Sequence, residues 1–163
     1  MRPGEKNKTT LGSSDRVKLL DVCRLLNRKR AKYLLIGGWA CNLHGLIRGT
    51  KDIDLLIPRD VANTKKILDA LGGLTWGIAR ELDAEEVARK PFTIVGDTPR
   101  VDLLTQGGGR VRYEDAAPTA LKVVIDGVRV PYVDVETLIR TKSTDRLQDK
   151  VDIERLRQFL KKK

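Results

Sequence analysis

The stretch that decides the fold is residues 37–57, which reads GGWACNLHGLIRGTKDIDLLI. A pair of glycines opens it, and an Asp-x-Asp pair lies inside the apolar run that closes it. The apolar run predicts a strand over residues 51–57, and side chains on a strand alternate between its two faces. We therefore expect Asp52 and Asp54 on one face of this strand, with the apolar side chains on the other: Ile53, Leu55 and Ile57.

Two carboxylates side by side on a strand repel each other unless a cation lies between them. Carboxylate oxygens suit Mg²⁺, which proteins usually hold through one or two carboxylates together with substrate phosphates. Gly37 and Gly38 allow backbone N–H groups to approach a phosphate, and the predicted helix after them points its positive end at the same place. Asp102, in a later predicted strand, is the candidate third carboxylate of a two-metal site.

Each of these features taken alone has an ordinary alternative. An Asp-x-Asp pair on a strand edge can face solvent, and a Gly-Gly pair can be a plain turn between a strand and a helix. Their occurrence together and in this order favours a phosphate and metal site.

The flanking sequence predicts a mixture of helices and strands around these residues. Apolar spacing predicts helices over residues 13–29, 39–44, 60–71, 134–141 and 145–160, with 81–89 either a short helix or an irregular segment. Asp60 and Asp134 are the candidate N-caps of the third and fourth of these helices. Short apolar runs predict strands over residues 33–36, 51–57, 92–95, 100–105, 122–125 and 128–130, the last two flanking the hairpin signal Asp126-Gly127. We therefore expect an α+β fold, one mixed β-sheet with flanking helices, in a single domain over residues 13–163.

The same spacing predicts which side chains of these helices are buried. Val61 is expected on the buried side of its helix, and Leu147 and Val151 on the buried side of the last helix. Residues 107–109 are three glycines, which predict a flexible loop. Residues 1–12 show no periodicity and are predicted to form a disordered, basic N-terminus.

The charge distribution is uneven, with a formal net charge of +10. Residues 1–32 carry ten Lys and Arg against three Asp and Glu, residues 140–163 nine against four, and residues 33–139 thirteen against fifteen. An acidic middle between basic flanks suits a cation site with a polyanion around it, although solvated basic termini are the alternative. Because there is no signal-peptide pattern and no apolar run of roughly 18 residues, we expect a cytoplasmic protein without a membrane partner.

The glycine pair, the Asp52-Ile53-Asp54 strand and the later Asp102 resemble the signature of the minimal nucleotidyltransferases of the DNA polymerase beta type. Residues 35–54, together with 138–142 and 146–152, look like the branch that contains the abortive-infection and toxin-type nucleotidyltransferases. The resemblance covers roughly residues 30–160. It implies a polymerase-beta-like nucleotidyltransferase fold and a metal-dependent enzyme that releases pyrophosphate.

The resemblance also implies roles for individual residues. Asp52 and Asp54 would hold two Mg²⁺ ions, with Mn²⁺ as the alternative metal, and Asp102 would bind one of them and help to activate an acceptor hydroxyl. Gly37 and Gly38 would contact the β- and γ-phosphates of a nucleoside triphosphate such as ATP.

Four basic residues are candidates for further nucleotide contacts. Lys142 and Arg146 are four residues apart, so they are expected to share one helix face. From that face Lys142 would steady the triphosphate, the alternative being a solvated helix surface. Arg48 and Lys51 are further candidates for phosphate contact.

Three functions fit these observations. The first is transfer of a nucleoside monophosphate to an RNA hydroxyl, such as a tRNA 3′ end, by a toxin-type enzyme with a cognate partner protein; the basic flanks favour it. The second is a small-molecule enzyme of the aminoglycoside-modifying type, which resembles the same glycine and aspartate run, although basic flanks repel a cationic drug. The third is a non-catalytic, antitoxin-like partner protein, against which three intact aspartates argue.

Overall fold

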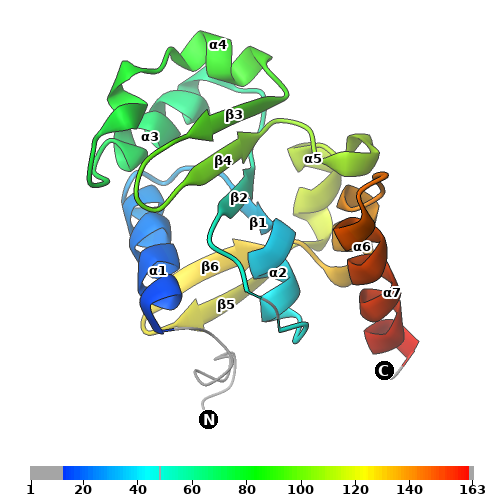
Figure 1. The fold of residues 1–163 in the computed structure, drawn as a ribbon. Coiled ribbons are helices and arrows are strands. Elements are labelled where there is room, and N and C mark those ends of the chain that lie inside the picture. Colours follow the sequence, from blue (N-terminus) through cyan, green and yellow to red (C-terminus); the bar gives the residue numbers. More distant parts are fainter. Residues whose placement is uncertain (1–12, 48, 162–163) are drawn as a thin grey trace.

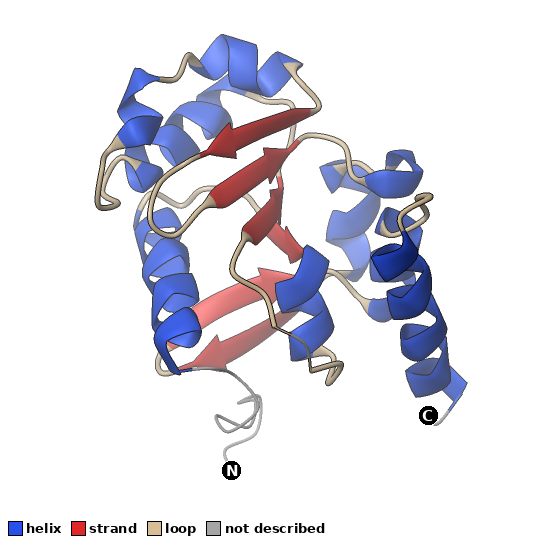
Figure 2. Ribbon diagram, viewed as in Figure 1, coloured by secondary structure: helices blue, strands red, loops and turns tan. Residues whose placement is uncertain are grey.

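The structure is a computed structural model that describes residues 13–47 and 49–161; the predicted N-terminal tail, residues 1–12, and Arg48 lie outside them. One six-stranded sheet with helices on both faces organises the chain (Figures 1 and 2). Its strands are β1 Leu34–Ile36, β2 Ile53–Leu56, β3 Phe92–Val95, β4 Val101–Leu104, β5 Leu121–Ile125 and β6 Val128–Tyr132. The sheet is mixed, which confirms the α+β prediction.

The order of the strands across the sheet is β3-β4-β2-β1-β6-β5. Strand β2 pairs antiparallel with β1 and parallel with β4. In this register Ile36, the last residue of β1, lies opposite Asp54, and Asp54 lies opposite Asp102 of β4. The pairing therefore brings the glycine turn that follows β1 and two of the three predicted acids to one place on three adjacent strands.

Helices cover both faces of this sheet (Figure 1). One apolar core cluster packs α1 Ser13–Arg28, α3 Val61–Leu71 and α4 Ala84–Arg89 against the sheet. A second cluster, on the other face, contains residues of α5 Tyr113–Ala116, α6 Val135–Thr141 and α7 Leu147–Lys161. The short helix α2 Gly37–Leu43 contributes to both clusters, and 3-10 turns occupy Ile78–Glu81, Gly108–Arg110 and Ala117–Thr119.

Local capping and turn signals in the sequence are confirmed. Asp60 caps α3 by accepting a hydrogen bond from the Asn63 backbone N–H at 3.1 Å, and Asp134 caps α6 through the Thr137 N–H at 2.9 Å. Asp126 and Gly127 join β5 to β6 with φ angles of 49° and 79°. Both angles are positive, as the two-residue hairpin turn requires.

Several burial predictions for the helices were wrong. Val61, Leu147 and Val151 are 37%, 77% and 43% exposed, whereas Asp149 and Asp152 of α7 are buried. The helix begins at Leu147 rather than at residue 145, and Leu156 and its neighbours further along make its apolar contacts. The first turns of α7 therefore face a polar site, so apolar spacing alone could not identify the buried side.

The three glycines at 107–109 pack closely on the end of α6 instead of forming an open connection. A side chain at Gly108 would collide with the Thr141 carbonyl oxygen, and one at Gly109, where φ is +64°, would meet the Arg140 carbonyl oxygen. Glycine is needed because two backbones approach each other here. Within the described residues, no helix combines the length and apolar character that crossing a membrane requires.

Candidate active site at the carboxyl end of β1

The turn after β1 lies directly against the Asp54 carboxylate. Gly37 has a φ of +69°, and a Cβ at this position would overlap Asp54 Oδ2. A Cβ on Gly38 would lie 2.9 Å from Thr50 Cβ, which is closer than real carbon contacts allow. Both glycines are therefore required by close approach, and Gly37 also by its left-handed backbone. The result is bare backbone beside an acidic side chain at the start of α2.

Asp54 and Asp102 are neighbours across the β2–β4 pair. Burial raises the pKa of Asp54 from its ordinary value of 3.8 to about 6, and the adjacent Asp102 carboxylate adds to this rise. Asp52 raises the same pKa further, while the positive charge of Lys142 opposes the shift. The two strands thus hold together like charges that are costly in the absence of a cation.

Asp52 lies just before the strand, because β2 begins at Ile53 rather than at residue 51. Its side chain is 49% exposed and reaches Arg100, with Arg100 Nε 3.9 Å from Asp52 Oδ2. The same guanidinium makes two hydrogen bonds to Asp102, from Nε to Oδ1 at 2.8 Å and from a terminal nitrogen to Oδ2 at 3.1 Å. Arg100 therefore bridges the first and the third predicted acid, a role that sequence analysis missed.

The donor set suits a divalent metal, although within residues 13–47 and 49–161 no three Asp, Glu, His or Cys side chains are grouped closely enough to hold one. Carboxylate oxygens are the ligands that Mg²⁺ and Mn²⁺ prefer. Asp54 and Asp102 already adjoin, and their mutual repulsion raises the pKa of Asp54. A cation placed at this pair would relieve that repulsion, so the residues fit the predicted metal, which stays a prediction.

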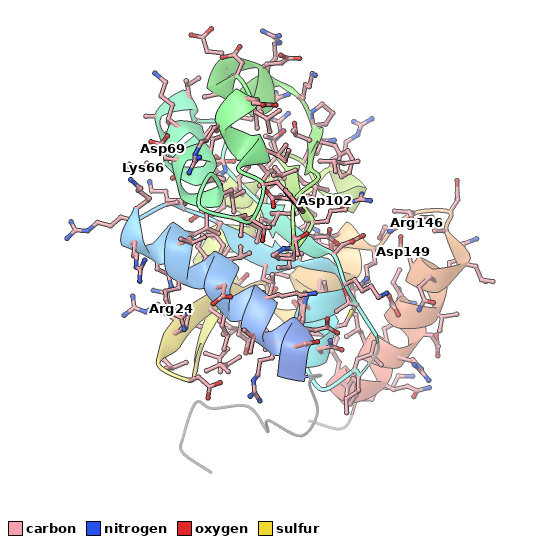
Figure 3. The ribbon with its side chains drawn as sticks, turned by 60° about the vertical axis from the view of Figure 1, so that its left-hand side comes forward. Arg24, Lys66, Asp69, Asp102, Arg146 and Asp149 are labelled. Carbon is pink, nitrogen blue, oxygen red and sulfur yellow. The ribbon has the colours of Figure 1, made fainter. Side chains whose placement is uncertain are left out.

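A pocket of about 440 Å³ opens beside Asp54. Its lining includes seven of the nine predicted site residues, namely Gly37, Gly38, Lys51, Asp52, Asp54, Lys142 and Arg146. Asp102 is not among the lining residues; it lies next to Asp54 in the sheet. The ninth, Arg48, lies outside the described residues. Figure 3 shows Arg146 and Asp149 on the side of α7 and Asp102 on the side of the sheet.

Lys142 is held by a buried network of acids. Its Nζ lies 3.0 Å from Asp152 Oδ2 and 3.7 Å from Asp149 Oδ1, and all three side chains are almost fully buried. Gln148 Nε2 donates to the other oxygen of Asp152 at 2.9 Å. Since buried charges are tolerated only when paired and hydrogen-bonded, this network fastens the end of α6 to the first turns of α7.

Arg146 joins the same network from its exposed side. Its Nε donates to Asp149 Oδ2 at 2.9 Å, and the Thr144 hydroxyl donates to the same oxygen at 2.5 Å. Burial of Asp149 acts to raise its pKa, but the hydrogen bonds from Thr144 and Arg146 and the charge of Lys142 hold that pKa below the ordinary value. The expectation that Lys142 and Arg146 share one helix face was wrong, because Lys142 caps α6 and Arg146 precedes α7.

Sequence analysis also missed the acids of this network as site residues. Asp149 and Asp152 are three residues apart in a predicted helix, a spacing that puts two acids on one side. That spacing was the available signal, but it equally suits a solvated helix face. The partner Lys142 lies on another element, so only the tertiary structure identifies the pair.

Comparisons with known proteins identify the family of the chain and a similar fold. The model of the aminoglycoside-2''-adenylyltransferase family matches residues 18–156. The fold is similar to the crystal structure of a protein from Thermotoga maritima described as a "putative nucleotidyltransferase", with a TM-score of 0.53 and 14% identity over 93% of this chain and 94% of that one. At this identity the likeness concerns the fold alone. A search of curated protein sequences found no match.

Proposed function

Because the chain belongs to the aminoglycoside-2''-adenylyltransferase family and is therefore a nucleotidyltransferase, we propose that it transfers a nucleoside monophosphate from a nucleoside triphosphate to a hydroxyl group of RNA, such as a tRNA 3′ end. The observation that carries this proposal is the contact of the Gly37 backbone with Asp54, beside Asp102 and in the lining of a pocket of about 440 Å³. Such a turn can hold phosphates next to acidic groups.

The acids would hold the metal in this proposal. Asp54 and Asp102 supply adjoining carboxylates, and Asp52 supplies a third from the edge of the pocket. When bound, Mg²⁺ or Mn²⁺ supplies positive charge that neutralises the triphosphate and the leaving pyrophosphate. A site for two ions follows from the resemblance and stays part of the proposal.

The chain's own groups would orient the substrates. Backbone N–H groups at Gly37 and Gly38 would bind phosphate oxygens, because neither residue has a side chain of its own and no side chain caps the start of α2. Lys142, Arg146 and Lys51 line the same pocket and would balance the remaining negative charge. In the reaction the acceptor hydroxyl oxygen bonds to the α-phosphorus, the bond to the pyrophosphate oxygen breaks, and Asp102 takes up the hydroxyl proton.

A second acceptor, a small aminoglycoside-like molecule, is favoured by the family match itself. The three acids that line the pocket suit such a cation: Asp52, Asp54 and Asp149. The overall charge of +10 opposes it and favours an anionic acceptor. A toxin-type role with a cognate partner protein stays a prediction from the resemblance.

Labelled nucleotides separate these acceptors. The protein is incubated with each of the labelled triphosphates of A, C, G and U and with Mg²⁺, once with total tRNA and once with aminoglycosides. Label in RNA is the expected result, whereas label in the drug alone would show that the small molecule is the acceptor. If no product forms and no triphosphate binds, a non-catalytic role is correct instead.

The Asp52→Ala variant provides the control for the metal assignment. Its side chain is exposed, so the fold should stay intact while transfer is lost. Circular dichroism checks the fold and product labelling checks the transfer. Full activity in this variant would show that Asp52 holds no essential ion.

A further inference from the structure

A basic groove lies at the amino end of β1, at the opposite end of that strand from Asp54. Its volume is about 810 Å³, and the end of α1, the β5–β6 hairpin and α5 bound it. Six exposed cationic side chains line it, and none of its described lining residues is acidic. These side chains, which define the basic groove, are Arg24, Arg28, Arg30, Lys32, Lys122 and Arg129.

Five of the six cations of the basic groove lack partners of opposite charge within the part of the chain that the structure describes. Only Arg24 pairs with a carboxylate there, Asp21 at 2.9 Å, and both members of this pair are exposed. An exposed pair of this kind contributes little to stability. The remaining five form no ion pair with any described carboxylate. Six neighbouring positive charges repel one another, and an anion in the groove would offset that repulsion.

The floor of the groove is fixed by hydrogen bonds between distant segments. Asn27 Nδ2 donates to the Arg129 carbonyl oxygen at 2.9 Å, and the buried Tyr33 hydroxyl donates to Asn27 Oδ1 at 2.8 Å. These bonds tie α1 to the hairpin that carries Lys122 and Arg129. The cations therefore project from a rigid base rather than from a tail.

One member of the set has an unfavourable backbone. Arg30 lies just past α1 with a φ of 56°, in the left-handed region where glycine is favoured after a helix. A side chain there is sterically disfavoured, because its Cβ lies too close to the following carbonyl oxygen. The chain nevertheless has an arginine at this position, which adds a sixth charge to the groove.

We propose that the basic groove binds the phosphate backbone of an RNA strand whose hydroxyl is the acceptor. The inference rests on the proposed function only in naming RNA as the acceptor. Six cations from three segments exceed what one triphosphate needs, whereas a backbone with one charge per nucleotide would meet them in succession. Tyr113, half-buried in the groove wall, offers an aromatic face to a base.

The position of the groove suits a substrate that spans both sites. Lys32, Tyr33 and Leu34 line the groove, and Gly37 follows the three-residue strand β1. The separation is thus roughly 10 Å along the strand, at about 3.3 Å per residue. Figure 3 shows Arg24 on the α1 side of the molecule, well away from Asp102 and Arg146. The groove is therefore distinct from the pocket at Asp54, and the two sites lie at opposite ends of β1.

Direct binding measurements test the proposal on the full chain. Fluorescence anisotropy with a labelled single-stranded oligouridylate of about 12 nucleotides gives the affinity at several salt concentrations. The variant Arg28→Glu/Lys122→Glu/Arg129→Glu should bind at least roughly tenfold more weakly at about 50 mM salt. The slope of log affinity against log salt should become shallower by roughly 0.7 for each phosphate that the variant no longer neutralises.

A matched variant controls for net charge. Lys65→Glu/Lys66→Glu/Arg155→Glu makes the same change in charge at exposed positions outside the groove. We expect it to bind the RNA nearly as tightly as the unaltered chain. Equal losses of affinity in the two variants, or no loss in the groove variant, would overturn the proposal, because the termini or the overall charge would then explain binding.

Two further measurements show whether the groove binds RNA or a nucleoside triphosphate. They also test RNA binding in the groove separately from nucleotide transfer. Labelled ATP should bind the groove variant as it binds the unaltered chain, and a parallel loss of ATP binding would make the groove a nucleotide site instead. The Asp54→Asn variant should bind RNA normally but transfer nothing. If the unaltered chain binds RNA but transfers no nucleotide to it, the proposed function is wrong. The proposal that the basic groove binds RNA would still stand in that case.

Discussion

At the carboxyl end of β1 charged side chains are largely buried and paired with one another, whereas at its amino end six cations are exposed and five have no partner among the described residues. The first region contains Asp54 beside Asp102 and the buried Lys142 network. The second is the basic groove. The contrast indicates a division of work, because buried pairs hold reacting groups in place and unpaired surface charges attract a ligand from solution.

The largest expected effect concerns the acid at the centre of the first region. Asp54→Asn keeps the shape of the side chain but removes its charge, so nucleotide transfer should fall by at least roughly 10³-fold. Product labelling measures the rate, and thermal unfolding checks the fold. Retained activity would mean that the half-buried Asp54 carboxylate beside Gly37 does not take part in the reaction.

The second prediction tests whether the buried charges depend on each other. Lys142→Met removes the buried cation that Asp152 and Asp149 share and should lower the free energy of unfolding by about 3–5 kcal/mol. Lys51→Met removes an exposed lysine from the same pocket and should leave that free energy almost unchanged. Urea denaturation measures the free energy of unfolding of both variants. If both change it only slightly and by the same amount, the ion pairs of Lys142 do not stabilise the fold.

The third prediction concerns pH and is made for the protein in excess chelator. Because the pKa of Asp54 is about 6 in the folded chain and its ordinary value is 3.8, folding favours the protonated acid. The contribution of protonated Asp54 to the free energy of unfolding is therefore fully present below about pH 4, and it is lost as the pH rises through 6. Asp54→Asn should remove this part of the pH dependence of unfolding, and an unchanged profile would contradict the assignment.

The smallest expected effect concerns Arg100, an exposed cation whose guanidinium group contacts Asp102. Arg100 competes with a metal for Asp102, so Arg100→Gln should bind Mn²⁺ roughly fivefold more tightly, which corresponds to about 1 kcal/mol. Calorimetric titration measures the affinity, with Arg89→Gln on the exposed end of α4 as the control. Weaker binding in the Arg100 variant would mean that Arg100 positions the acids for the metal.

Much of the fold was predictable because its signals are local. Strand β3 has the predicted bounds, and the caps at Asp60 and Asp134 and the turn at Asp126-Gly127 lie where the sequence predicted them. Each depends on the conformational preferences of a few adjacent residues. The helix α5 and the close packing of Gly108 were not predicted, because short helices and backbone contacts depend on distant partners.

The candidate site was predictable to the extent that it lies in one continuous stretch. The glycine pair and Asp54 are within eighteen residues of one another, and their order alone suggested phosphate and metal chemistry. The sequence did not predict that Asp52 lies just before the strand, nor that Arg100 donates hydrogen bonds to Asp102. Both depend on where β2 begins to pair with β4, which is a property of the sheet rather than of either segment.

The sequence by itself determined the class of fold and the chemical character of its central turn, because alternation, capping and glycine spacing act over a few residues. Only the tertiary structure decided which charges are neutralised and which have no oppositely charged partner among the described residues. Lys142 is paired with Asp152 by the packing of α7 on α6, and Lys122 and Arg129 join the α1 arginines through the hairpin. The reason is that electrostatic energy depends on distance and burial in space, and neither follows from separation along the chain.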